Sequence, residues 1–128
     1  MNNDSLVLRM VYGRASALLE GDAEAPSEHA MVDDGQHGGP ALGPDTLLKV
    51  GHHGSRTSTT PEFLALAAPL DAVISVGAQN TFGHPRPEII QRLADEHARV
   101  FRTDRFGATT FLLSPDGSIV AVPATSNP

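Results

Sequence analysis

The chain contains no cysteine and no tryptophan, and basic residues are few. Without cysteine it can form neither a disulfide nor a thiolate metal site. The cysteine count therefore does not indicate whether the protein works in an oxidising or a reducing compartment. Nine Lys and Arg residues stand against fifteen Asp and Glu residues, giving a formal net charge of -6. This balance excludes a broad basic surface that coats nucleic acid, although a bound cation would reverse the local field.

A long hydrophobic run is also lacking. The most apolar stretch, residues 63–76, is interrupted by Pro69 and Asp71, and it is shorter than the roughly 18 residues of a membrane-spanning helix. The first four residues carry no positive side chain, unlike the start of a signal peptide. We therefore expect the chain to be soluble as written.

What the sequence does contain indicates one folded domain. Its 128 residues are 40% hydrophobic and 19% charged, as in globular proteins. Predicted strands alternate with predicted helices, which is typical of an α/β fold. The strands are expected at 5–12, 15–20, 46–50, 71–76, 99–102, 108–113 and 119–122, and the helices near 23–32, at 60–68 and from 87. The domain is expected over 1–123, with a flexible glycine-rich loop at 33–45 and a disordered tail at 124–128.

Three polar clusters follow predicted strands: Gly21-Asp22, His52-His53 and Gly83-His84-Pro85. Ligands of open α/β sheets gather at strand ends, on loops that a rigid scaffold holds. Imidazole and carboxylate groups suit Zn²⁺ or Mn²⁺. Taken singly, each cluster is also typical of an ordinary turn or structured loop.

The remaining histidines lie at positions that do not suggest a site. His29 and His97 fall in predicted helices among polar neighbours, and His37 falls in the glycine-rich loop. We expect His29 and His97 to be solvated and His37 to have no functional role. Asp104 is most simply explained as a turn acid.

Together the clusters form an ordered set of motifs. The segments NNDSLVLR (2–9), GDAE (21–24), LKVGHHGS (48–55) and NTFGHP (80–85) occur in this order. With them, the chain resembles the metallo-β-lactamase-like domain at the C-terminal end of ComEC-type competence proteins, the inner-membrane DNA-uptake channels of bacteria. The resemblance continues at 87–88, 101–104 and 107–108, and covers nearly the whole chain except the loop and the tail.

The resemblance implies roles for individual residues. Asp22 matches the acid that bridges two metals in this superfamily, and His52-His53 matches the last metal-binding histidine. His52 is the first choice as ligand, but the sequence does not decide between the two. The implied catalytic set is Asp22, His53 and His84, with His84 near the substrate. Ser55 would orient the loop, and the metal would be Zn or Mn.

Two departures from the family limit these roles. The His-x-(His or Asp)-x-Asp-His motif, which supplies most metal ligands in the family, is absent, and Arg86 stands where the family often has a second histidine. The resemblance therefore implies the C-terminal half of an αββα sandwich, with a mixed sheet and flanking helices. Its ligand set would be incomplete, and the half-domain inactive alone. An upstream segment or a separate chain would supply the other half.

Three functions follow. The first is part of a metal-dependent phosphodiesterase or nuclease domain that acts on DNA, in a protein of the bacterial inner membrane whose channel lies upstream. The second is a non-catalytic remnant or interaction module. The third is part of a stand-alone soluble metallo-β-lactamase-fold hydrolase. Membrane-spanning segments upstream would favour a channel protein over the third function.

Overall fold

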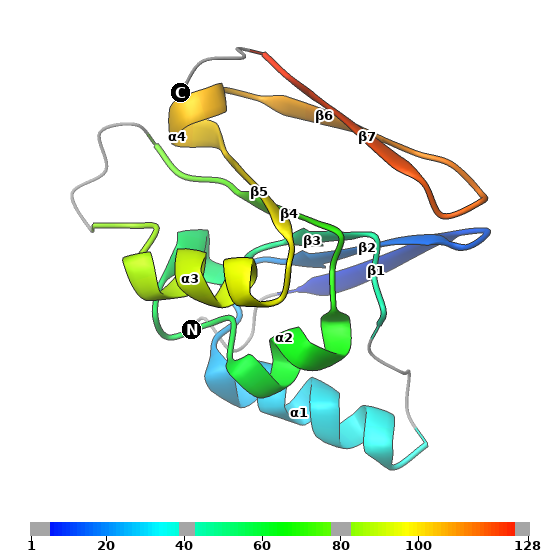
Figure 1. Cartoon of the computed structure of the whole chain (residues 1–128). Coiled ribbons are helices and arrows are strands. Elements are labelled where there is room, and N and C mark those ends of the chain that lie inside the picture. Colours follow the sequence, from blue (N-terminus) through cyan, green and yellow to red (C-terminus); the bar gives the residue numbers. More distant parts are fainter. Residues whose placement is uncertain (1–5, 39–42, 78–82, 125–128) are drawn as a thin grey trace.

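A five-stranded mixed sheet forms the centre of the molecule (Figure 1). The structure, a computed structural model, describes residues 6–38, 43–77 and 83–124. The strand order is β1-β2-β3-β4-β5, with β1 (Val7–Tyr12), β2 (Ala15–Glu20), β3 (Leu47–Lys49), β4 (Asp71–Ile74) and β5 (Arg99–Arg102). β1 runs antiparallel to β2, and β2 to β5 are parallel. The predicted α/β class is confirmed.

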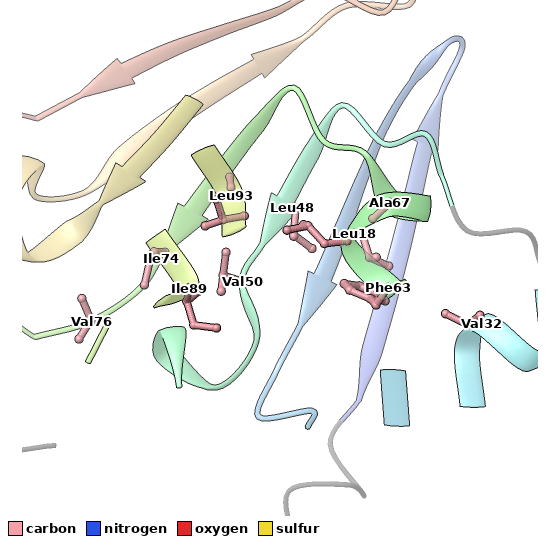
Figure 2. Packing of buried hydrophobic residues seen from close by; sticks show 12 residues of the cluster. Leu18, Val32, Leu48, Val50, Phe63, Ala67, Ile74, Val76, Ile89 and Leu93 are labelled. Carbon is pink, nitrogen blue, oxygen red and sulfur yellow. The ribbon is translucent and has the colours of Figure 1, made fainter. Parts of the chain in front are cut away.

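Three helices cover one face of this sheet (Figure 1). They are α1 (Ala25–Gln36), α2 (Pro61–Ala67) and α3 (Pro87–Asp95). α2 begins as its sequence predicts, because Pro61 holds the first position and the Thr60 hydroxyl accepts a hydrogen bond from Phe63 N at 3.3 Å. Between helices and sheet lies one apolar core (Figure 2), which includes Leu18, Leu48, Val50, Phe63, Ile74, Ile89 and Leu93.

The predicted flexible loop at 33–45 is wrong at both ends. Residues 33–36 belong to α1, because Val32 is buried in the core and holds the helix beyond its predicted end. Asp45 is buried too, and its Oδ1 accepts hydrogen bonds from Arg9 Nε and Ser16 Oγ, each at 2.9 Å. Residues 39–42 of this loop and 125–128 of the predicted tail lie outside the described ranges.

Asp104 is not a turn acid. It lies in the short helix α4 (Thr103–Phe106) and pairs with Arg102, whose Nη2 is 2.7 Å from Asp104 Oδ2. This two-residue ion pair holds the pKa of Asp104 below its ordinary value and favours the helical turn over an open loop.

The other face of the sheet is covered only in part. A hairpin of β6 (Thr109–Leu113) and β7 (Ile119–Pro123) packs there through Phe111, whose ring lies 5.4 Å from that of Phe101. Beside the hairpin this side of the sheet contains an apolar cavity of about 480 Å³. We call the surface around this cavity the open face. Its lining includes Met10, Tyr12, Ala17, Leu19, Leu47 and Leu113. The edge strand β1 leaves Met10 57% and Tyr12 59% exposed.

Helices of this fold are short. Within the described ranges, none is long and apolar enough to cross a bilayer.

Candidate functional site

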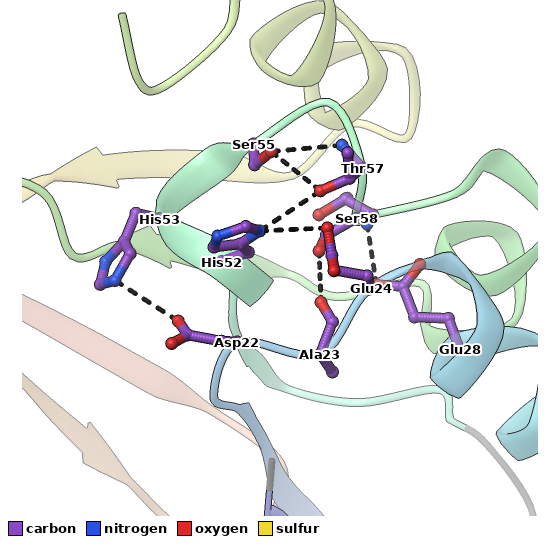
Figure 3. A network of polar contacts seen from close by, with 10 residues as sticks. Asp22, Ala23, Glu24, Glu28, His52, His53, Ser55, Thr57 and Ser58 are labelled. Atoms are coloured by element: carbon purple, nitrogen blue, oxygen red, sulfur yellow. Dashed lines mark hydrogen bonds and ion pairs between the residues drawn. The ribbon is translucent and has the colours of Figure 1, made fainter. Parts of the chain in front are cut away.

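The candidate residues lie at the carboxyl edge of the parallel strands (Figure 3). Asp22 follows β2, the tight turn η2 (Gly51–Gly54) follows β3, and Ser75 follows β4. Two backbone hydrogen bonds tie the loops together, from His52 N to Gly21 O at 2.9 Å and from Ala25 N to Thr57 O at 2.8 Å. The parallel arrangement thus brings together segments that are distant in the sequence.

The two adjacent histidines face different partners. Both have left-handed backbone conformations, with φ 49° at His52 and 55° at His53. His53 Nε2 lies 3.4 Å from Asp22 Oδ1, whereas His52 Nδ1 lies 3.5 Å from Glu24 Oε2 (Figure 3). The structure therefore pairs Asp22 with His53 rather than with His52.

The His53 ring is held in one orientation. Its Nδ1 lies 2.7 Å from the carbonyl oxygen of Ser75. A carbonyl can only accept, so Nδ1 donates, and the lone pair of a neutral ring is left on Nε2, facing Asp22. Metal-binding histidines are commonly oriented through their second nitrogen in this way. Both side chains are accessible, with His53 50% and Asp22 47% exposed.

Ser55 stabilises the loop around His52. Its Oγ lies 2.9 Å from Thr57 Oγ1, and Thr57 Oγ1 lies 3.3 Å from His52 Nδ1. Its backbone N–H donates to the carbonyl of His52 at 2.9 Å. Ser55 thus acts on His52 through Thr57 and the backbone.

His84 joins the cluster because two loops are packed tightly together. Gly54 has φ +80°, and a Cβ built there would lie 2.6 Å from Pro85 Cβ. Arg86 N donates to Gly54 O at 2.9 Å across the same contact. As a result the His84 ring lies 5.9 Å from that of His52, nearly perpendicular to it. Burial, then the neighbouring His52, Arg86 and His53, keep the pKa of His84 below its ordinary value, which favours the neutral imidazole. Asn80 of the NTFGHP motif lies outside the described residues.

Two buried glutamates beneath the loops were not predicted. Glu28 accepts hydrogen bonds from Thr59 N at 2.7 Å and Thr60 N at 2.8 Å, which fixes the start of α2. Both carboxyl oxygens of Glu20 are buried. Burial, together with the nearby Glu28 carboxyl, raises the pKa of Glu20 to about 10. An acid closing an otherwise apolar strand was the sequence signal for Glu20.

The other histidines are exposed, which confirms the prediction for His29 and His97. His29 lies on α1, and His37 caps this helix with its Nδ1 3.3 Å from Asp33 Oδ1. His97 differs from the prediction in one respect, since α3 ends at Asp95 and His97 lies beyond it with φ +62°.

Comparisons with known proteins identify the relatives of this chain. No protein-family model matches it. It is 40% identical over 110 residues to ComE operon protein 3 of Bacillus subtilis, which is 86% of this chain and 14% of that protein. It is 37% identical over 116 residues to competence protein ComA of Neisseria gonorrhoeae, and 38% identical over 92 residues to recombination protein 2 of Haemophilus influenzae. The chain belongs with the ComEC-type competence proteins.

The similarity is confined to a small part of each relative. The matched segment covers 91% of this chain but 16% of the Neisseria protein, and 72% of this chain but 11% of the Haemophilus protein. The chain therefore spans about a seventh of the ComEC-type proteins that it matches, and the sequence resemblance to this family is confirmed.

The donor atoms of the site lie in pairs and do not form a complete set of metal ligands. In the parts of the chain that the structure describes, no three His, Asp or Glu side chains are grouped to hold a metal ion. Asp22 and His53 offer two suitable donors, and a stable zinc site needs about three protein ligands. Asp22 and His53 therefore fit part of a metal site, while His52 contacts Glu24 instead.

Proposed function

We propose that this chain is part of a metal-dependent hydrolase domain, of the phosphodiesterase or nuclease class, in a ComEC-type competence protein. The fold would be the C-terminal half of a metallo-β-lactamase-like αββα sandwich. DNA would be the substrate. In this proposal the complete protein lies in the bacterial inner membrane and exposes this domain to water. The observation that carries the proposal is the Asp22–His53 pair, whose histidine is oriented by Ser75 O.

The roles of the residues follow from their positions. Asp22 and His53 would hold the ion, and the Ser75 carbonyl would keep His53 Nε2 turned toward it. Zn²⁺ or Mn²⁺ suits an imidazole and a carboxylate, and either ion would supply a metal-activated water and a Lewis acid. The neutral imidazole of His84 would contact the substrate, and Ser55 would stabilise the His52 loop through Thr57.

The remaining ligands would come from another segment, either of the same polypeptide or of a separate chain. The relatives are about seven times as long as the segment they share with this chain, so such proteins contain ample sequence for it. The open face is the surface that this segment would cover. An apolar cavity of about 480 Å³ bordered by exposed Met10 and Tyr12 is characteristic of a contact surface.

A non-catalytic interaction module is the second candidate function. It is favoured by the absence of a third donor near Asp22 and His53 within the described ranges. In that case the site residues would be retained without binding metal, and the open face would be the functional surface.

Metal binding by the complete protein separates the two candidates. We expect Asp22→Asn and His53→Ala to lower Mn²⁺ or Zn²⁺ affinity at least tenfold, measured by calorimetry, and to abolish metal-dependent DNA cleavage. The matched control is Asp33→Asn with His37→Ala, a surface Asp-His pair 3.3 Å apart at the end of α1. If the complete protein binds no metal, or if the control loses as much metal as the site variants, the hydrolase proposal is refuted.

A further inference from the structure

Arg86 brings a positive charge to the imidazole cluster. It follows His84-Pro85 and precedes α3, with its backbone bonded to Gly54 O. Its guanidinium lies close to Gly83, as the distance of 3.5 Å between Arg86 Nη1 and a Cβ built on Gly83 shows. Its charge also contributes to the lowered pKa of His84. The guanidinium is therefore an electrostatic neighbour of His84.

Three arginines of the described ranges form ion pairs, whereas Arg86 and the remaining arginines do not. Arg9 pairs with Asp45 at 2.9 Å and Arg99 with Asp71 at 2.7 Å. Arg86 has no carboxylate within ion-pair distance among the described residues, and its Nε is buried without a hydrogen-bond partner. Buried donors are almost always satisfied in folded proteins. Among the arginines, Arg86 is the one with a buried nitrogen left unsatisfied within the described ranges, and this makes it the candidate for contact with an external anion.

The local chemistry suits a phosphodiester. A guanidinium offers a planar fork of donors that matches phosphate oxygens, and the adjacent start of α3 adds the positive end of a nine-residue helix. The net charge of -6 rules out a broad cationic surface for nucleic acid, so any phosphate contact must be made by individual residues such as this one.

We propose that Arg86 anchors a phosphodiester group of the nucleic-acid backbone beside the His52–His84 cluster. The substrate class rests on the function proposed above, whereas the anion contact rests on Arg86 itself. The side chain is not needed for the loop contact, which uses the backbone N–H of Arg86. Replacing the side chain therefore leaves this hydrogen bond available.

The test is binding of a fluorescently labelled decathymidylate to the chain without metal, followed by anisotropy across a range of salt concentrations. We expect Arg86→Ala to weaken binding about tenfold and to reduce the salt slope by about 0.7, the value of one single-strand phosphate contact. Arg86→Lys should restore part of the affinity. Arg14→Ala is the matched control, since it removes the same charge from the β1–β2 turn, one strand length away from the site.

Three outcomes would overturn the inference. They are an unchanged affinity and salt slope in Arg86→Ala, an equal loss in Arg14→Ala, or inorganic phosphate that binds as tightly as the oligonucleotide. The last result would assign Arg86 to free phosphate. Metal affinity, measured on the same variants, distinguishes this inference from the hydrolase proposal. If the complete wild-type protein has no metal affinity while its oligonucleotide binding still depends on Arg86, the hydrolase proposal is refuted and the anchor is supported.

Discussion

The packing of Gly54 against Pro85 predicts a large effect of one added methyl group. In Gly54→Ala the new Cβ would lie 2.6 Å from Pro85 Cβ and 2.9 Å from Pro85 Cα, so one of the two loops must move. Such overpacking costs about 1–3 kcal/mol. The φ of +80° adds about 1–2 kcal/mol for a residue with a side chain. The loss of chain freedom in the unfolded state returns about 0.4–1 kcal/mol.

Together these contributions lower the free energy of unfolding by about 2–4 kcal/mol, since the favourable unfolded-state effect offsets part of the cost. For a domain of this size the melting temperature would fall by about 8–16 °C. Thermal unfolding followed by circular dichroism measures this directly. The expected loss is a substantial part of the roughly 5–15 kcal/mol by which domains are stable.

Gly38→Ala is the matched control. Gly38 also has a positive φ, +90°, but no atom lies within 4 Å of the Cβ that would be added. It should show only the backbone cost, about 1 kcal/mol after the unfolded-state gain. Equal shifts in the two variants would refute the reasoning, because the contact with Pro85 would then contribute nothing.

Two further predictions concern buried carboxyl groups. Because the pKa of Glu20 is raised to about 10 from an ordinary 4.5, the folded state holds a proton that the unfolded state releases, and stability falls as pH rises through this window. Urea unfolding should therefore show Glu20→Gln gaining stability over the wild type between pH 5 and pH 9; a constant difference would contradict the raised pKa. Arg99→Ala should cost about 1–2 kcal/mol in the same assay, because it leaves the fully buried Asp71 without its 2.7 Å partner, a cost reduced by the 60% exposure of the Arg99 side chain. Asp71→Asn combined with Arg99→Ala should recover part of this loss, and a double variant no more stable than Arg99→Ala would argue against an uncompensated charge.

Most of the fold could be predicted because each element has a local signal. The apolar run at 5–12 followed by the Gly13-Arg14 turn predicted the β1–β2 hairpin, and the Thr60-Pro61 pair predicted the start of α2. α1 was predicted too short, because glycine-rich composition after Val32 outweighed a packing contact that only the folded chain contains. Local signals thus located elements well and their ends less well.

The sequence predicted which loops form the candidate site, but not which side chains in these loops contact each other. Strand-end positions placed Asp22 and the two histidines at the same sheet edge, as the parallel strands require. Which histidine faces Asp22 depends on two positive φ values in η2, which leave no mark in the residue types. The burial of Glu28 under α2 depends likewise on a contact between distant segments.

The left-handed backbone of His52 and His53 has a consequence for how this protein would change under selection for stability alone. Residues with side chains adopt this conformation at a cost of about 1–2 kcal/mol each, whereas glycine adopts it freely. Glycine at either position would therefore give a more stable chain with one imidazole fewer. Laboratory evolution toward higher melting temperature would remove these histidines early, and lineages that keep both would be those in which the imidazoles are in use.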